Sequence, residues 1–316
     1  MPDSNCKFGL TWIPRVGYLR LVRSRCNLLS CGFSLRTLNC FVASFSILIA
    51  VCSPVVAQSR NNPAPSVLAA NPAAGVELDQ GADAYRHARY DEAIVHFQKA
   101  VDLEPSLFVA KLYLAVALSQ TVVPGATSPE NLRTAQRAID NFQQVLKGRP
   151  HDADTMKMIA AVEFSVGMLD DSKAWQKKVL VENPRDPEAA YTIGVIDWTQ
   201  AHQNVLTTLA PFGLKDDGMG NASAPPKAMK AIMAQNSALI AEALKYLDEA
   251  VDNRPNYSDA MAYLNLVYRR KADVDWDNEA ARNEDVANAE MWFRRSMEAR
   301  KANEEKKGAG SDSEPH

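Results

Sequence analysis

Residues 90–105 read YDEAIVHFQKAVDLEP, and this stretch decides the fold. Ala93, Phe97 and Ala100 recur at intervals of four and three residues, which places them on one face of an α-helix. Two acidic residues stand near the start of the stretch, where the helix dipole favours negative charge. Pro105 cannot continue the helix, because it lacks a backbone N–H and its ring clashes with the preceding turn. The stretch therefore predicts a helix that buries one face and ends just before Pro105.

The same spacing recurs further along the chain. A small residue is followed by a larger one after four positions, by another core-type residue after three more, and by a proline after five more. The copies are Ala138, Phe142, Val145 and Pro150; then, more weakly, Ser172, Gln176, Val179 and Pro184; then Ala243, Leu247, Ala250 and Pro255; and a degraded copy, Ala289, Phe293 and Ser296, without the proline. Pro150 and Pro184 lie 34 residues apart, which gives the length of one uninterrupted period.

A second helix is predicted ahead of each copy. Good capping residues precede four of these helices, at Ser106, Asp152, Asp186 and Ser258. Each helix carries a small or short residue where it would cross its partner, and these are Gly81, Ala115, Ala160, Gly194 and Asn265. In the uninterrupted units the small residue that begins each copy follows twelve positions later. We expect the two small residues to meet, because only small side chains let two helices approach closely.

Paired helices with this spacing resemble tetratricopeptide repeat proteins, whose 34-residue unit has the pattern W-x2-L-G-x2-Y, then A-x3-F, then P. The leading tryptophan of that pattern is missing throughout, and three units carry insertions between their two helices. The resemblance implies an all-α, right-handed α-solenoid of about five repeats over residues 74–300. The expected repeats are 74–107, 108–152, 153–186, 187–257 and 258–300. An ordinary helical bundle would share the helical periodicity but not the proline at the end of each period.

The resemblance also implies a binding surface, because the first helix of each repeat lines the concave groove in this family. Projected onto this sequence, the groove residues are Tyr85, Arg86, Lys157, Phe164, Tyr191, Trp198, Arg269 and Arg270. Aromatic residues and arginines contribute most to interface energies. We therefore expect a protein or an extended peptide to bind across them. The alternative for these aromatics, and for Trp198 in particular, is a place in the core between repeats.

An acidic stretch, DVDWDNEAARNE at residues 273–284, suggests a different function. Its residues Asp273, Asp275, Asp277 and Glu284 follow the spacing of a calcium loop of the EF-hand type. Asn278 stands where that loop requires glycine. The alternatives are a calcium-responsive binding module and a solvated acidic connector.

The N-terminal residues have the composition of an export signal. Residues 1–57 contain six basic side chains and one acidic one, and they end in the apolar run FVASFSILIAVCSPVVA. We expect a signal peptide cleaved after Ala57, with an uncleaved membrane anchor as the alternative, which would make the protein an envelope-tethered adaptor. A flexible linker is expected at 58–73 and a disordered tail at 301–316. All five cysteines precede Ala57, so the remaining chain has neither a disulfide nor a cysteine metal site, which suits a periplasmic or extracellular location.

Composition and motifs argue against other classes of function. Beyond residue 57, acidic side chains outnumber basic ones by eight, and no basic stripe typical of nucleic-acid binding is present. The chain contains no G-x-S-x-G motif, no phosphate-binding loop and no dinucleotide-binding motif. We therefore expect a binding scaffold, and neither an enzyme nor a protein that holds a cofactor.

Overall fold

The computed structural model describes residues 69–311 of the chain. The expected signal or anchor at 1–57, most of the expected linker and residues 312–316 lie outside the described residues. Residues 69–311 form α-helices without any β-strand. The helices are α2 (Pro72–Arg86), α3 (Tyr90–Leu103), α4 (Phe108–Thr121), α5 (Pro129–Gly148), α6 (Ala153–Ser165), α7 (Leu169–Glu182), α8 (Pro187–Leu209), α9 (Pro226–Asn253), α10 (Ser258–Val274) and α11 (Glu279–Ser311), with a 3-10 turn, η4 (Ala210–Phe212), after α8.

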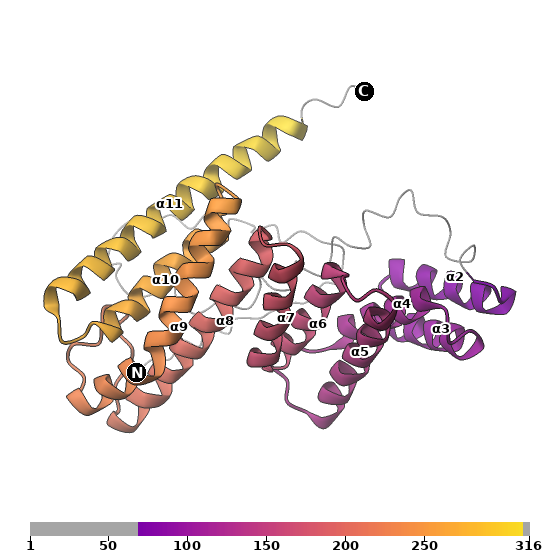
Figure 1. Cartoon of the computed structure of the whole chain (residues 1–316), viewed down its shortest axis with the longest axis horizontal. Coiled ribbons are helices and arrows are strands. Elements are labelled where there is room, and N and C mark those ends of the chain that lie inside the picture. The colour runs from indigo at the N-terminus through magenta and orange to yellow at the C-terminus, as the bar shows by residue number, and fades with distance from the viewer. Residues whose placement is uncertain (1–68, 312–316) are drawn as a thin grey trace, which may run out of the picture. The chain divides into compact units, whose positions relative to one another are not determined.

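The helices pack in sequence order, as Figure 1 shows. Each of the pairs α2–α3, α4–α5, α6–α7, α8–α9 and α10–α11 forms one repeat, and the second helix of each pair also packs against the first helix of the next. This confirms the all-α fold of five helix-turn-helix repeats, with insertions between the paired helices. Within residues 69–311, no helix is both long enough and apolar enough to cross a membrane.

The caps explain where several helices begin. The Asp152 side chain accepts from the backbone N–H of Thr155 at the start of α6, and Asp186 accepts from two backbone N–H groups at the start of α8. The expected caps Ser106 and Ser258 do not act in this way: α4 and α10 begin after Leu107 and Tyr257, without a side-chain cap. These two helix starts therefore depend on packing, which outweighs local capping.

The two helices of a repeat cross closely at small residues, but the partner differs from the one expected in two repeats. A Cβ atom added to Gly81 would lie 2.5 Å from the Phe97 ring, and one added to Gly194 would lie 2.4 Å from Leu247. The glycine therefore accommodates the larger residue of the second helix, four positions after the small one. In the third repeat the small residues do meet, since the Ser172 hydroxyl donates to the Ala160 carbonyl over 2.8 Å.

The long connection between α8 and α9 is fastened to α10. Asp216 in this connection accepts from the Arg270 guanidinium at 2.8 Å, and Asn221 donates to Asp273 at 2.7 Å. Asn221 has a φ of 49°, and Gly220 approaches the Ala272 carbonyl so closely that an added Cβ would lie 2.8 Å from it. The connection is therefore a defined structure rather than a loose loop.

The last helix is longer than the sequence analysis expected. It continues to Ser311, whereas a disordered tail was expected from residue 301. The segment from residue 301 to 306 reads KANEEK, and these residues, apart from the asparagine, are good helix formers. Their propensity extends the helix beyond the end of the repeat.

Candidate partner-binding site

Five ring side chains form a continuous row on α8, on α10 and in the turn before α10, which we name the aromatic ladder: Tyr191, Trp198, His202, Tyr257 and Tyr263. The Tyr191 ring lies 5.1 Å from that of Tyr257 and 5.6 Å from that of Tyr263, measured between ring centroids. The Tyr263 ring meets Trp198 edge-on at 5.4 Å, and Trp198 is stacked on His202 at 5.0 Å. Edge-on and stacked contacts at these distances are the arrangements that aromatic rings prefer.

The ladder has a buried base and an accessible rim. Tyr191 and Tyr263 are buried, and burial raises the pKa of Tyr263 to about 12. Trp198, His202 and Tyr257 are partly exposed. Burial, reinforced by the nearby Arg270 charge, lowers the pKa of His202, so its ring is neutral at pH 7. The rim rings are therefore fixed from below by buried rings, with the Arg254 guanidinium over Tyr257 and an Asp216 carboxylate oxygen 3.8 Å from His202.

Charged groups border the ladder at its Tyr257 end. The Lys157 ammonium of α6 lies 2.5 Å from an Asp186 carboxylate oxygen and 3.5 Å from one of Glu188. Glu188 also accepts from Arg254 at 3.0 Å, and the Arg254 guanidinium lies over the Tyr257 ring at 4.6 Å. These ion pairs connect α6, α8 and the end of α9. They fix the positions of these helices relative to one another beside the ladder.

A second ion-pair network joins α8 to α7 and α9. Lys173 of α7 donates to Asp197 at 2.7 Å and to Glu242 of α9 at 3.2 Å. Burial raises the pKa of Asp197 to about 6, although Lys173 opposes this shift. Asp197 directly precedes Trp198, so the network fixes the segment of backbone from which the Trp198 ring projects.

Three of the residues expected in the groove are partly exposed beside the ladder or within it: Lys157, Phe164 and Trp198. Phe164 packs against the core cluster that contains Tyr191 and Tyr263. Tyr85 and Arg86 lie on α2 in the first repeat, where Tyr85 contacts the Tyr90 ring and Arg86 pairs with Asp83. They belong to a different part of the repeat series from the ladder, which lies in the fourth and fifth repeats.

The structure corrects the expectation for Tyr191 and Arg270. Tyr191 is buried under Tyr257 and Tyr263, and Arg270 is buried by the connection that Asp216 anchors. Neither side chain offers an accessible surface to a partner. Arg269, the neighbour of Arg270, is partly exposed and donates to the Gly218 carbonyl and to Glu290.

Two rim residues were missed in the sequence. His202 lies four positions after Trp198 on the same helix, and this spacing alone could have indicated a shared face. Tyr257 gives no such signal, because the long α8–α9 insertion and the whole of α9 separate it from Tyr191 in the sequence.

The four carboxylates of the expected calcium loop do not converge. Asp273 belongs to α10 and is buried against Arg270 and Asn221, while Asp275 pairs with Lys271 at 2.7 Å. Asp277 and Glu284 are exposed, the first in the turn before α11 and the second within α11. No group of three or more histidine, cysteine or acidic side chains within residues 69–311 is arranged to hold a metal ion. The calcium interpretation is therefore wrong for this loop, because its ends continue the two helices.

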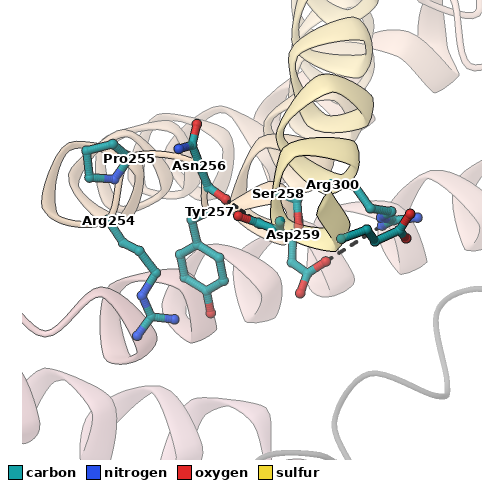
Figure 2. A pocket seen from close by; sticks show the side chains of 9 residues that line it. Arg254, Pro255, Asn256, Tyr257, Ser258, Asp259 and Arg300 are labelled. Carbon is teal, nitrogen blue, oxygen red and sulfur yellow. Dashed lines mark hydrogen bonds and ion pairs between the residues drawn. The ribbon is translucent and has the colours of Figure 1, made fainter. Parts of the chain in front are cut away.

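A shallow hollow of about 480 Å³ lies where the α9–α10 turn meets α11. Figure 2 shows the side chains that line it, with Arg254 and Arg300 among them. The Arg254 guanidinium donates a hydrogen bond to Glu188, and a guanidinium nitrogen of Arg300 lies 3.7 Å from a carboxylate oxygen of Asp259. Because both cations have carboxylate partners, we assign no ligand to the hollow.

Comparison with known proteins supports the fold. No protein-family model and no curated protein matches the chain. Among solved structures, a MamA protein described as the RS-1 ArsTM double mutant has 17% identity and a TM-score of 0.50, covering 74% of this chain and 98% of that one. MamA from Desulfovibrio magneticus RS-1, starting at residue 41, has 17% identity, the same coverage and a TM-score of 0.49. An IFIT1 monomeric mutant with Gppp-AAAA has 16% identity and a TM-score of 0.43, covering 73% of this chain and 44% of that one. At these identities the likeness is one of fold alone.

Proposed function

We propose that this chain is a binding scaffold that holds a partner protein or peptide against the aromatic ladder. The observation that carries the proposal is the partly exposed Trp198 ring, stacked on a neutral His202 and supported by the buried Tyr263. Rigid, partly exposed aromatic rings supply contact area with little loss of side-chain entropy on binding, which is why they dominate binding energies. Phe164 extends this apolar surface towards α6.

The partner expected here is an extended segment with apolar side chains. The Trp198–His202 stack carries no charge of its own, and the charged groups beside it are already paired: Asp216 with Arg270, and Glu188 with Arg254. Such a surface selects apolar groups and gains little from a strongly charged ligand. The fold supports this proposal only in general terms, since the same fold serves many kinds of partner.

Removing the Trp198 ring tests this function. We expect Trp198→Ala to weaken capture of the partner at least tenfold, because it removes the central exposed ring of the ladder, and such a loss is about 1.4 kcal/mol or more. Affinity capture from a cell-envelope extract, quantified by mass spectrometry, measures the change. Val181→Ala is the matched control, since Val181 is 77% exposed on α7, away from the ladder. Equal capture by wild type and Trp198→Ala would count against the proposal.

We also propose that the protein is exported, on the basis of its basic and apolar N-terminal 57 residues and the absence of cysteine from the rest of the chain. Intact-mass measurement of the protein purified from its native source should give a chain that begins at Gln58. A chain that retains residues 41–57 would instead indicate the envelope-tethered adaptor.

A further inference from the structure

His202 lies in the middle of an accessible stripe on α8. Trp198 is four positions before it and Leu206 four positions after it, so the three side chains lie along one side of the helix. Trp198 is partly exposed, and Leu206 is 36% exposed. The His202 ring stacks on the Trp198 ring with 5.0 Å between the centroids and 8° between the planes. A partner segment that contacts both Trp198 and Leu206 therefore covers His202 as well.

The carboxylate beside His202 is already bonded to other groups. One oxygen of Asp216 accepts from the Arg270 guanidinium at 2.8 Å. The same oxygen accepts from the Asn221 side chain and from the Gly218 backbone N–H, each at 3.0 Å. The other oxygen lies 3.8 Å from His202 Nδ1, which is longer than a hydrogen bond. The negative charge next to His202 is therefore balanced by Arg270.

A proton on His202 would add a second positive charge to this cluster. Among the described residues, Arg270 on α10 and Asp216 in the connection between α8 and α9 are the charged groups that act on the ring. Burial, and then the Arg270 charge, lower the pKa of His202 against the opposing effect of Asp216. Asp273 lies 3.0 Å from Arg270, but burial raises its pKa to about 7, so it loses its negative charge as the pH falls. The neutral ring is therefore the favoured form of His202.

Covering the ring with an apolar segment would strengthen this preference. Removing water from an ionisable group disfavours its charged form, so the pKa of His202 would fall further when a partner binds. By linkage, a partner that binds the neutral form more tightly loses affinity as the free chain takes up the proton. A single proton changes the affinity by at most about tenfold per pH unit.

We propose that His202 makes the aromatic ladder release its partner on acidification, so that the scaffold holds the partner at neutral pH and frees it in an acidic environment. This regulation rests on the proposed function, because it requires a partner on the Trp198–His202 stack. It also assigns an uncharged, apolar group of the partner to His202. A partner carboxylate at this place would bind the protonated ring and reverse the pH dependence.

The experiment compares binding to the immobilised full chain at two pH values. The probe is the set of cell-envelope proteins that the wild-type chain captures at pH 7.5 and that Trp198→Ala does not. At pH 5.0 the bound amount of these proteins should fall by about threefold or more. His202→Phe keeps a flat ring that cannot take up a proton, so its bound amount should be the same at both pH values. His202→Gln is a second neutral variant with the same expectation, and His151→Phe, at an exposed histidine, should behave as wild type.

The outcomes separate this inference from the proposed function. If the wild-type chain captures no protein that Trp198→Ala loses, the proposed function is wrong and the inference is wrong with it. If such proteins are captured but stay bound at pH 5.0, or bind more tightly there, only the pH regulation is wrong. Release that persists in both His202 variants would overturn the inference as well, because Asp197, Asp273 or a group of the partner would then be responsible.

A titration of the free chain tests the same inference without a partner. The ring C–H signals of His202 in the NMR spectrum can be assigned by their absence from His202→Phe. They should shift with a midpoint below pH 6.5, the ordinary pKa of histidine. A midpoint at or above pH 6.5 would contradict the proposal, because the surroundings of His202 would then not favour the neutral ring.

Discussion

Replacing Arg270 by methionine should lower the free energy of unfolding by about 3–5 kcal/mol, the usual cost of breaking a buried ion pair by removing one partner. Arg270 is 3% exposed, and its guanidinium donates to Asp216 at 2.8 Å. The second guanidinium nitrogen lies 3.0 Å from an Asp273 oxygen, although the angle between them does not make a hydrogen bond. Methionine would fill a similar volume but would leave the Asp216 carboxylate without its counter-charge.

The two carboxylates around Arg270 respond differently to their surroundings. Burial by itself would raise the pKa of Asp216, but the charge and hydrogen bond of Arg270 lower it below its ordinary value. Burial raises the pKa of Asp273 to about 7, against the opposing effect of Arg270. Asp216 is therefore the ionised partner of Arg270 at neutral pH, and it carries most of the cost when the arginine is removed.

Guanidinium chloride unfolding at pH 7 measures the Arg270→Met effect, and amide hydrogen exchange in residues 216–221 reports release of the connection from α10. Adding Asp216→Asn to Arg270→Met should restore part of the lost stability, because the double variant no longer buries an unpaired charge. Arg294→Met, a substitution of an exposed arginine on α11, is the control and should change the stability by less than about 0.5 kcal/mol. A loss below about 1 kcal/mol for Arg270→Met would show that the ion pair does not hold the connection.

The repeats could be predicted from the sequence, but part of the site could not, and the connection between α8 and α9 shows why. The spacing of Ala93, Phe97 and Pro105 is local, and each copy reports a helix that must bury one face, so the helix pairs could be found from sequence. The burial of Arg270 depends on Asp216, which is 54 residues away. Local patterns contain no information about such a contact, and an arginine on the first helix of a repeat therefore looked accessible.

The calcium-loop interpretation of residues 273–284 was wrong for a related reason. Its spacing matches an ion-binding loop, but that function requires the backbone to leave the helix at Asp273. In the structure α10 continues through Asp273 to Val274, because Ala272 and Asp273 are buried against the neighbouring elements. Tertiary packing thus sets the end of α10, and the spacing of the acidic residues carries no information about it.

Phe293 shows the limit of transferring a pattern from one repeat to the next. Its spacing from Ala289 correctly predicts a second helix in the fifth repeat. The same spacing also suggests a buried phenylalanine, yet Phe293 is 47% exposed and the neighbouring Trp292 is buried instead. In the first and fourth repeats a glycine of the paired helix makes room for the equivalent side chain, whereas α10 has Asn265 at that place. The exposed ring therefore reflects a different packing of α11 against α10, which the spacing from Ala289 does not reveal.

Glu163→Gln should stabilise the protein by about 2 kcal/mol at pH 8 and destabilise it by about 1 kcal/mol at pH 4. Glu163 lies in α6 and is 4% exposed. One of its carboxylate oxygens accepts from the Trp175 indole N–H at 3.2 Å, and the other has no hydrogen-bond partner among the described residues. Burial, and then the charge of Asp171, raises the pKa of Glu163 from 4.5 to about 7.

The sign of the pH dependence follows from this shift. Between pH 4.5 and 7 the folded chain holds a proton on Glu163 that the unfolded chain releases, so stability rises as the pH falls through this range. Above pH 7 the carboxylate is ionised in both states, and its burial costs about 3 kcal/mol at 1.36 kcal/mol per pKa unit. Glutamine removes this cost and keeps the oxygen that accepts from Trp175. Its buried amide nitrogen lacks an acceptor, which costs about 1 kcal/mol and leaves a net gain of about 2 kcal/mol.

Urea unfolding of wild type and Glu163→Gln at pH 4, 6 and 8 tests this prediction. The difference in unfolding free energy between the two proteins should grow with pH and level off near pH 8. Asp154→Asn, which removes an exposed carboxylate from the same helix, should give a difference that stays close to zero throughout. A constant difference for Glu163→Gln at all three pH values would contradict the prediction. It would mean that the pKa of Glu163 is the same in the folded and unfolded chains, because only a carboxyl group that gains a proton on folding produces the predicted slope.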